Sequence, residues 1–367
     1  MKLVIFGLAI SSSWGNGHAT LWRGLCTALS HRGHRITFFE RDVEWYAAHR
    51  DLTELPGGRL VLYTDWSEAL DEARRELMDA DAAIVTSYCP DAVRAEALMG
   101  EVGVPTRAFY DLDTPVTLAR LAAGEPVGYI GPRGLRDFDL VLSYTGGKAL
   151  EALRERLGAR RVAPLYGSVD PSVHRPVPPG EAYRADLSYL GTFAADRQAT
   201  LEELFIEPAR RHPARRFLLG GSGYPQTFPW TRNIYFVRHL PPAEHPAFFA
   251  SCRLTLNVTR AAMAAMGWCP SGRLFEAAAC GAPIVSDAWE GLGSFFAPGQ
   301  EILIARHADE IGEMLERPDE ELRRIGRAAR ERALHEHTAE RRAEELVTLL
   351  GKNDTSRASA LLGAMGG

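Results

Sequence analysis

The segment from Pro270 to Asp287 holds the residue types best suited to chemistry in this chain. Ser271 and Gly272 are typical of the start of a helix, and Gly281 is typical of its end. A helix that begins with small residues presents free backbone N–H groups and the positive end of its dipole, and both attract phosphate. Arg273 adds a planar fork of hydrogen-bond donors at this end. The segment therefore predicts a binding site for a phosphate group.

Glu276 follows Arg273 by three residues on the same face of the predicted helix. A carboxylate behind an anion site suits a nucleoside diphosphate, because the ribose hydroxyls can donate to it. A core helix with a surface ion pair between Arg273 and Glu276 would show the same residues. This segment alone leaves both interpretations open.

Further candidates follow the predicted strands in the second half of the chain. Ligands of parallel α/β sheets bind beyond the carboxyl ends of the strands, so small and polar residues at these ends are expected in one site. Gly191 permits close approach of a ligand to the backbone, and Arg197 can reach a phosphate there. The predicted nucleotide-binding residues are Gly191, Thr192, Arg197, Arg238, His239, Asn257, Ser271, Gly272, Arg273 and Glu276.

The first half of the chain carries a partial dinucleotide-binding pattern. Gly15-Asn-Gly-His18 follows the first predicted strand, but Thr20 stands where a third glycine would be. Glu40 ends the second predicted strand, near the position of the ribose-binding acid of a dinucleotide-binding domain. A nicotinamide-dependent oxidoreductase is therefore one rival interpretation.

Asp111 and Asp113 end another predicted strand and spell D-x-D. This motif binds metal in some transferases, but here Asp113 also suits the cap of a helix that begins near Pro115. Either carboxylate could orient or deprotonate an acceptor hydroxyl. The candidate catalytic residues are His18, Asp113 and Asp111. No set of His and Cys has the spacing of a zinc motif, so no metal is expected.

Composition and charge describe an ordinary globular protein. The chain has 367 residues, of which 46% are hydrophobic and 24% are charged. The formal net charge of −5 gives no general attraction to nucleic acid or anionic membranes, so neither is expected as a partner. No apolar run reaches the roughly 18 residues of a membrane span.

The cysteines and the N-terminus predict a cytoplasmic protein. Five cysteines form no C-x-x-C pair and several lie in apolar surroundings, as free thiols do in a reducing compartment. The apolar start, Met1 to Ile10, is too short for a signal peptide, and residues 11–18 resemble a strand-to-helix loop.

Alternating strand and helix patterns predict an α/β protein with two Rossmann-like, doubly wound domains facing across a cleft. We expect an N-terminal domain at residues 1–168 and a C-terminal domain at 183–350. The proline-rich segment 169–182 is expected as the hinge between them, and residues 351–367 as a disordered tail.

Motifs spread over residues 1 to about 300 resemble a known family. The chain is similar to GT-B glycosyltransferases, and more closely to the CgeB-like (spore-maturation protein) glycosyltransferases. The motifs that carry the resemblance are Gly15-Asn-Gly-His18, Phe38-Phe-Glu-Arg-Asp42, Tyr110-Asp-Leu-Asp-Thr-Pro115, Gly191-Thr-Phe-Ala-Ala-Asp-Arg197 and Pro270-Ser-Gly-Arg-Leu-Phe-Glu-Ala-Ala-Ala-Cys-Gly281.

The resemblance implies roles for several residues. The Glu that matches Glu276 binds the donor ribose in the large retaining GT-B families, and the loop matching His18 carries the base of inverting ones. A second Glu of the retaining families falls on Trp268, so the sugar and a retaining outcome do not carry over. Their Arg and Lys match Thr192 and Arg197, which leaves one cationic contact missing.

These observations predict a metal-independent glycosyltransferase of hexosyltransferase type. It would move a sugar from a nucleotide-diphosphate donor, a UDP- or dTDP-sugar, to the hydroxyl of an unidentified glycan, small molecule or protein, with no tightly bound cofactor. The N-terminal domain would bind the acceptor and the C-terminal domain the donor. A sugar-nucleotide epimerase of the same fold and a non-catalytic sugar-nucleotide-binding protein are the alternatives.

Overall fold

The computed structural model describes residues 1–364, with side chains through Gly351. It divides the chain into two compact units. Unit 1 comprises Met1–Tyr166 and the chain from Ala339 onward, and unit 2 is the continuous stretch Gly167–Thr338. Each unit is built around its own parallel sheet.

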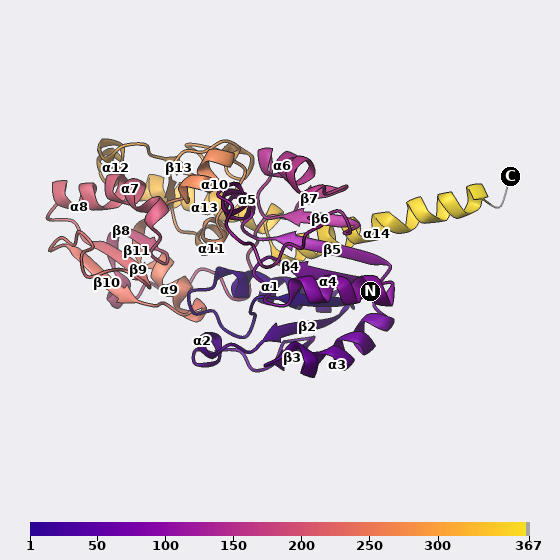
Figure 1. Ribbon diagram of the computed structural model, residues 1–367. Helices are drawn as coiled ribbons and strands as arrows, with labels where there is room; N and C mark the ends of the chain where they lie inside the picture. The colour runs from indigo at the N-terminus through magenta and orange to yellow at the C-terminus, as the bar shows by residue number, and fades with distance from the viewer. Residues whose placement is uncertain (365–367) are drawn as a thin grey trace. The chain divides into compact units, whose positions relative to one another are not determined.

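Unit 1 contains a seven-stranded sheet in the order β3-β2-β1-β4-β5-β6-β7, in which every pair is parallel (Figure 1). The strand order reverses beside β1, which is where α/β sheets place their ligands. The strands are β1 (Lys2–Gly7), β2 (Arg35–Arg41), β3 (Arg59–Tyr63), β4 (Ala82–Thr86), β5 (Thr106–Asp111), β6 (Leu140–Ser143) and β7 (Val162–Pro164).

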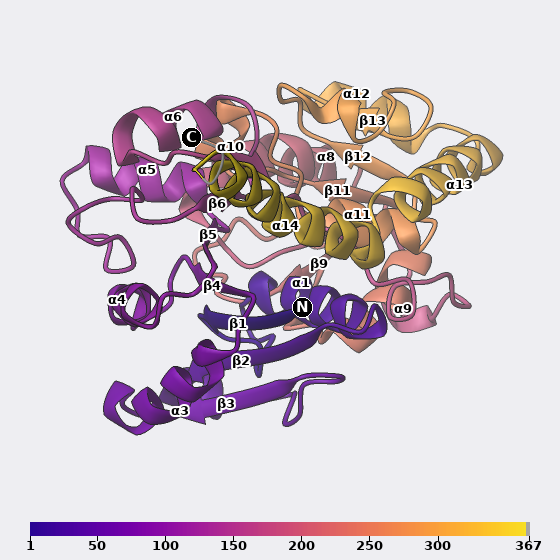
Figure 2. The same ribbon diagram turned by 90° about the vertical axis from the view of Figure 1, so that its right-hand side faces the viewer.

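Helices cover both faces of this sheet. The core on one face includes Trp22 of α1 and Leu346 of α14, two helices that lie against each other (Figure 2). The core on the other face includes Leu77 of α3 and Leu98 of α4. The helices of unit 1 are α1 (Gly17–His31), α2 (Glu44–Ala47), α3 (Trp66–Met78), α4 (Ala92–Val102), α5 (Thr114–Ala122), α6 (Lys148–Leu157) and α14 (Ala339–Ala364).

Unit 2 repeats this plan with a six-stranded parallel sheet in the order β10-β9-β8-β11-β12-β13. Its order reverses beside β8, so a ligand is expected where β8 and β11 end. The strands are β8 (Ala185–Leu190), β9 (Phe217–Gly221), β10 (Ile234–Arg238), β11 (Cys252–Asn257), β12 (Ile284–Ser286) and β13 (Leu303–Ile304).

The helices of unit 2 are mostly short. The predicted helix at 197–211 is interrupted, because a π-helical turn (Glu202–Ile206) separates α7 from α8. The α-helices are α7 (Gln198–Leu201), α8 (Glu207–Arg211), α9 (His245–Ala250), α10 (Ala261–Met266), α11 (Gly272–Ala279), α12 (Ala308–Leu315) and α13 (Asp319–Glu336), and the 3-10 turns are Glu181–Tyr183, Ala195–Arg197, Pro242–Glu244 and Leu292–Ser294.

The unit boundaries differ from the expected domains at two places. The segment expected as a hinge, 169–182, belongs to unit 2, where the Val169 N–H donates to His337 O at 2.9 Å. The last helix, expected in the C-terminal domain, belongs to unit 1 because its apolar residues complete the core beside α1. Sequence periodicity shows that a helix has an apolar face but not which sheet that face covers.

The last helix extends into the segment 351–367, which was expected as a disordered tail. Helix α14 continues to Ala364, and residues 365–367 lie outside the described residues. Residues 352–362 contain neither proline nor glycine, so a helix that is already packed can extend through them at little cost. Among the described residues, no helix is long and apolar enough to cross a membrane.

Candidate active site

The start of α11 is the centre of the candidate site in unit 2. Ser271 is the N-cap residue, and no side chain caps the free N–H groups of the first turn. The Arg273 guanidinium lies at this end, where its Nη1 donates to Asn257 Oδ1 at 3.1 Å and to Ser271 Oγ at 3.4 Å. Asn257 is the last residue of β11 and is buried. The end of β11 and the start of α11 thus hold one cation beside a helix start that has no side-chain cap.

Gly191 brings the end of β8 to the same place. A Cβ atom at Gly191 would lie 2.9 Å from Arg273 Nη2 and 2.7 Å from the Tyr189 hydroxyl oxygen, so a side chain there would displace one of them. The Arg273 guanidinium also lies 5.4 Å from the centre of the Tyr189 ring. Four predicted residues, Gly191, Asn257, Ser271 and Arg273, are therefore brought together around one guanidinium.

The remaining predicted residues of unit 2 lie around this group with weaker connections. Arg197 donates from Nη2 to the backbone carbonyl of Thr192. Arg238 ends β10 as an exposed residue, and His239 follows it with a left-handed backbone, φ 50°, its N–H donating to Gly221 O at 2.8 Å. The positive charge of Arg197 also acts on Arg273 and helps to lower the pKa of its guanidinium.

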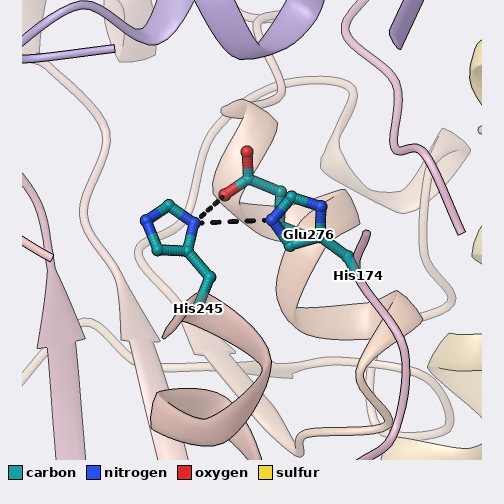
Figure 3. A group of neighbouring side chains, drawn as sticks. All are labelled: His174, His245 and Glu276. Atoms are coloured by element: carbon teal, nitrogen blue, oxygen red, sulfur yellow. Dashed lines mark hydrogen bonds and ion pairs between the residues drawn. The ribbon is translucent and has the colours of Figure 1, made fainter. Parts of the chain in front are cut away.

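Glu276 lies one turn into α11 and meets two histidines (Figure 3). Its Oε2 is 3.5 Å from His245 Nδ1, and His245 Nδ1 is 3.4 Å from His174 Nε2. His245 is the first residue of α9 and donates from Nε2 to Leu240 O at 3.2 Å, whereas His174 lies in the loop after Gly167. The second carboxylate oxygen of Glu276 points away from both imidazoles in Figure 3.

The electrostatic environment keeps Glu276 ionised. Burial alone would raise the pKa of its carboxyl, but His174, His245 and Arg273 together lower that pKa to about 2. Burial lowers the pKa of Arg273 from its usual value. A partly buried anion and a partly buried cation are thus held on the same helix, where each can bind a charged or polar ligand group.

Trp268 occupies the position at which the resemblance would place a second Glu. Its backbone is left-handed, φ 50°, and its N–H donates to Glu290 O at 2.7 Å. Its indole lies 6.4 Å from the Phe295 ring, so this position carries packing in place of a carboxylate.

The predicted catalytic residues of unit 1 meet at the ends of β1 and β5. Asn16 caps α1 by accepting from the His18 N–H at 3.1 Å, which fixes His18 at the helix start. His18 Nε2 is 3.8 Å from Asp113 Oδ2, and each side chain is 19% exposed. The Tyr88 ring, after β4, lies 5.7 Å from the His18 ring, and burial and the nearby Asp113 carboxylate raise the pKa of its hydroxyl. These three groups form a partly open polar cluster.

Asp111 has a different environment from Asp113. It is fully buried, and its Oδ1 accepts from the Asp113 N–H at 3.1 Å and from Thr117 Oγ1 at 3.1 Å. Burial raises the pKa of Asp111 to about 6, although both of these hydrogen bonds oppose the rise. The carboxylate that can meet a ligand is therefore that of Asp113, and Asp111 shapes the loop that carries it.

Three residues of these clusters were missed by sequence reasoning: His174, His245 and Tyr88. His174 and His245 are separated by 71 positions and share no motif, so their meeting depends on the fold. Tyr88 carries one local signal, because it follows a buried strand as Asp111 does. Its left-handed backbone, φ 63°, is strained for a residue with a side chain.

Comparison with known proteins gives one family match, in the second half of the chain. Residues 197–348 match a family model described as "Glycosyl transferase-like". That range contains α11, Arg273 and Glu276, and it also includes part of α14. None of the curated proteins compared with the chain matches it.

Solved structures resemble the whole chain at low sequence identity. Sucrose-phosphate synthase from Thermosynechococcus elongatus has a TM-score of 0.69 at 13% identity, over 97% of this chain and 100% of that one. Anabaena Alr3699/HepE in complex with UDP and glucose has a TM-score of 0.67 at 12% identity, over 96% and 100% of the two chains. An alpha-glucosyltransferase in complex with UDP and a mismatched DNA has a TM-score of 0.65 at 12% identity, over 95% and 99%.

At such identities the likeness establishes the fold, and the family match adds the class of activity. The two parallel sheets with alternating helices confirm the predicted fold class. The chain is thus a glycosyltransferase of the GT-B fold, with a glycosyl transferase-like domain at residues 197–348.

Proposed function

We propose that this protein transfers a hexosyl group from a UDP- or dTDP-sugar to an acceptor hydroxyl, without a metal ion at the diphosphate. The observation that carries the proposal is the Arg273 guanidinium beside the uncapped start of α11. Backbone N–H groups and a fixed cation are the groups that stabilise a departing diphosphate. Structural neighbours with UDP bound agree with this choice of donor.

Glu276 would bind the ribose. Its carboxylate is ionised and lies one turn beyond Arg273, and one of its oxygens points away from the histidines (Figure 3). A charged hydrogen-bond acceptor that lies one helical turn from the phosphate site suits the two ribose hydroxyls. The residues of the phosphate site and the ribose site therefore share one short helix.

His18 and Asp113 would activate the acceptor hydroxyl. The pair is partly exposed and lies where β1 and β5 of unit 1 end. General-base catalysis typically contributes about 100-fold or more to kcat, so His18→Ala and Asp113→Asn should each lower kcat by roughly that factor at unchanged UDP affinity. If both variants keep the wild-type kcat, the transfer needs no base from this pair.

The proposal also keeps two finer expectations from the sequence. We propose that the chain is a CgeB-like enzyme, on the motifs that resemble that family. We propose a cytoplasmic location, because all five cysteines are buried free thiols, as in a reducing compartment.

Titration calorimetry with UDP in the presence of EDTA tests the donor site. A hydrogen bond to a charged group contributes about 1.5–3 kcal/mol, so Arg273→Ala should raise the Kd of UDP roughly ten- to hundred-fold, and Arg273→Lys should raise it less. Arg184→Ala, a change at a 75% exposed arginine of the same unit, is the matched control. Equal UDP affinity in wild type and Arg273→Ala would refute this site.

A further inference from the structure

His174 and His245 have no role in the proposed sugar transfer, yet they form a cluster with Glu276 (Figure 3). They come from three separate segments of unit 2, and their ligand atoms all lie within 4.8 Å of one another. We propose that these three side chains bind a divalent transition-metal ion, with Zn²⁺ as the first candidate. The site goes beyond the proposed function, because it needs neither donor nor acceptor.

The spacing of the ligand atoms fits a zinc site. Zn²⁺ bonds nitrogen and oxygen at about 2.0–2.2 Å, and a tetrahedral arrangement then separates neighbouring ligand atoms by roughly 3.3–3.6 Å. His245 Nδ1 lies 3.4 Å from His174 Nε2 and 3.5 Å from Glu276 Oε2. Two edges of the tetrahedron are therefore already present.

The hydrogen positions also favour a cation. The contact of His245 Nε2 with Leu240 O requires a proton on Nε2, so in the neutral imidazole Nδ1 carries a lone pair. This lone pair faces the Glu276 carboxylate and His174 Nε2, and one shared proton can satisfy only one of these contacts. A metal ion between the three atoms accepts a lone pair from each.

Burial and the surrounding groups point to a built site. His174 is 1% exposed, and the side chains of His245 and Glu276 are 13% and 14% exposed. The bond from His245 Nε2 to a backbone carbonyl is the outer contact that metal-binding histidines usually make. Two imidazoles and a carboxylate suit zinc better than Mg²⁺, which prefers oxygen ligands and keeps several waters.

The ion would connect the loop at His174 to helices α9 and α11. It would hold one oxygen of Glu276 and leave the other free, together with an open fourth position for water or a ligand oxygen. Motifs with closely spaced ligands give no sign of such a site, because the three residues are spread over the chain from 174 to 276.

Metal binding to the full-length protein tests the proposal without nucleotide. After dialysis against EDTA, titration with ZnCl₂ should show one ion per chain and raise the Tm, and MgCl₂ should do neither. His174→Ala and His245→Ala should each weaken Zn²⁺ binding more than ten-fold, since loss of even an outer partner weakens metal sites ten- to hundred-fold. His335→Ala, at a side chain that is 76% exposed on α13, should bind as wild type does.

X-ray absorption of the wild-type zinc complex provides a test that does not depend on how the variants fold. The first shell should contain only nitrogen and oxygen at about 2.0–2.2 Å, with an imidazole signature. Sulfur in the first shell, absence of stoichiometric binding, or equal loss of binding in His335→Ala would overturn the site. UDP affinity measured in EDTA reports separately on the proposed function, so either proposal can fail alone.

Discussion

The substitution Asp111→Asn tests whether the Asp111 carboxyl has a structural role and not a catalytic one. Asp111 is fully buried, and burial raises its pKa from 3.8 to about 6. An acid whose pKa is raised on folding stabilises the fold only while it is protonated, so this contribution is lost as the pH rises through about 6. The wild type should therefore lose stability between pH 5 and pH 8, and a variant without the carboxyl should lose less.

The size of the effect follows from the two pKa values. With 3.8 in the unfolded chain and about 6 in the folded protein, linkage gives a wild-type loss of about 1.4 kcal/mol between pH 5 and pH 8 from this group alone. The substitution to an amide also changes the free energy of unfolding by an amount that does not depend on pH. This amount cancels when the values at pH 5 and pH 8 are subtracted. Relative to wild type, Asp111→Asn should gain about 1.4 kcal/mol over this range.

Urea denaturation followed by circular dichroism at pH 5, 6, 7 and 8 measures this difference. Asp309→Asn, at a side chain that is 84% exposed, corrects for the change in net charge. The free energy of unfolding of Asp111→Asn relative to wild type should rise with pH. If this difference stays constant, or falls as the pH rises, the pKa of Asp111 is not raised by burial. Transfer activity within a few-fold of wild type would agree with a role in positioning the loop.

Two further predictions concern glycines that hold elements close together. Gly191→Ala places a Cβ 2.9 Å from Arg273 Nη2, and by displacing that guanidinium it should raise the Kd of UDP roughly ten-fold, measured by calorimetry; an unchanged Kd would contradict the position of Arg273. Gly326→Ala places a Cβ 2.3 Å from Gly281 O and should destabilise unit 2 by about 1–3 kcal/mol in urea denaturation. Gly351→Ala, where a Cβ meets nothing within 4 Å inside helix α14, should instead stabilise by up to about 1 kcal/mol, and the same sign for both alanines would contradict the packing described.

Local sequence patterns predicted the strands, the start of α11 and much of the group around Arg273. These signals are local: a continuous apolar run predicts a buried parallel strand, and Ser271-Gly272 predicts a helix start. Strand ends of one parallel sheet converge, so Gly191 and Asn257 could be assigned to one site before the fold was known.

Long-range partners could not be predicted in this way. The pairing of His245 with Glu276 depends on how α9 packs against α11, and no spacing rule joins them. The same limit applies to α14, whose apolar face is evident in the sequence although its partner sheet is not. The sequence also could not distinguish Asp111 from Asp113, because the burial of Asp111 and the partial exposure of Asp113 follow from the turn between them.

Thermal unfolding with a panel of nucleotides tests the central claim, a nucleoside diphosphate bound at the start of α11. The purified protein would be heated with UDP, dTDP, GDP, CDP or NAD at millimolar concentration, with EDTA or with magnesium. A ligand at 100 times its Kd stabilises the folded state by about 2.7 kcal/mol, which raises the Tm by several degrees. We predict such a rise with UDP or dTDP that does not need magnesium. A rise with NAD alone, or none with any nucleoside diphosphate, would contradict the claim.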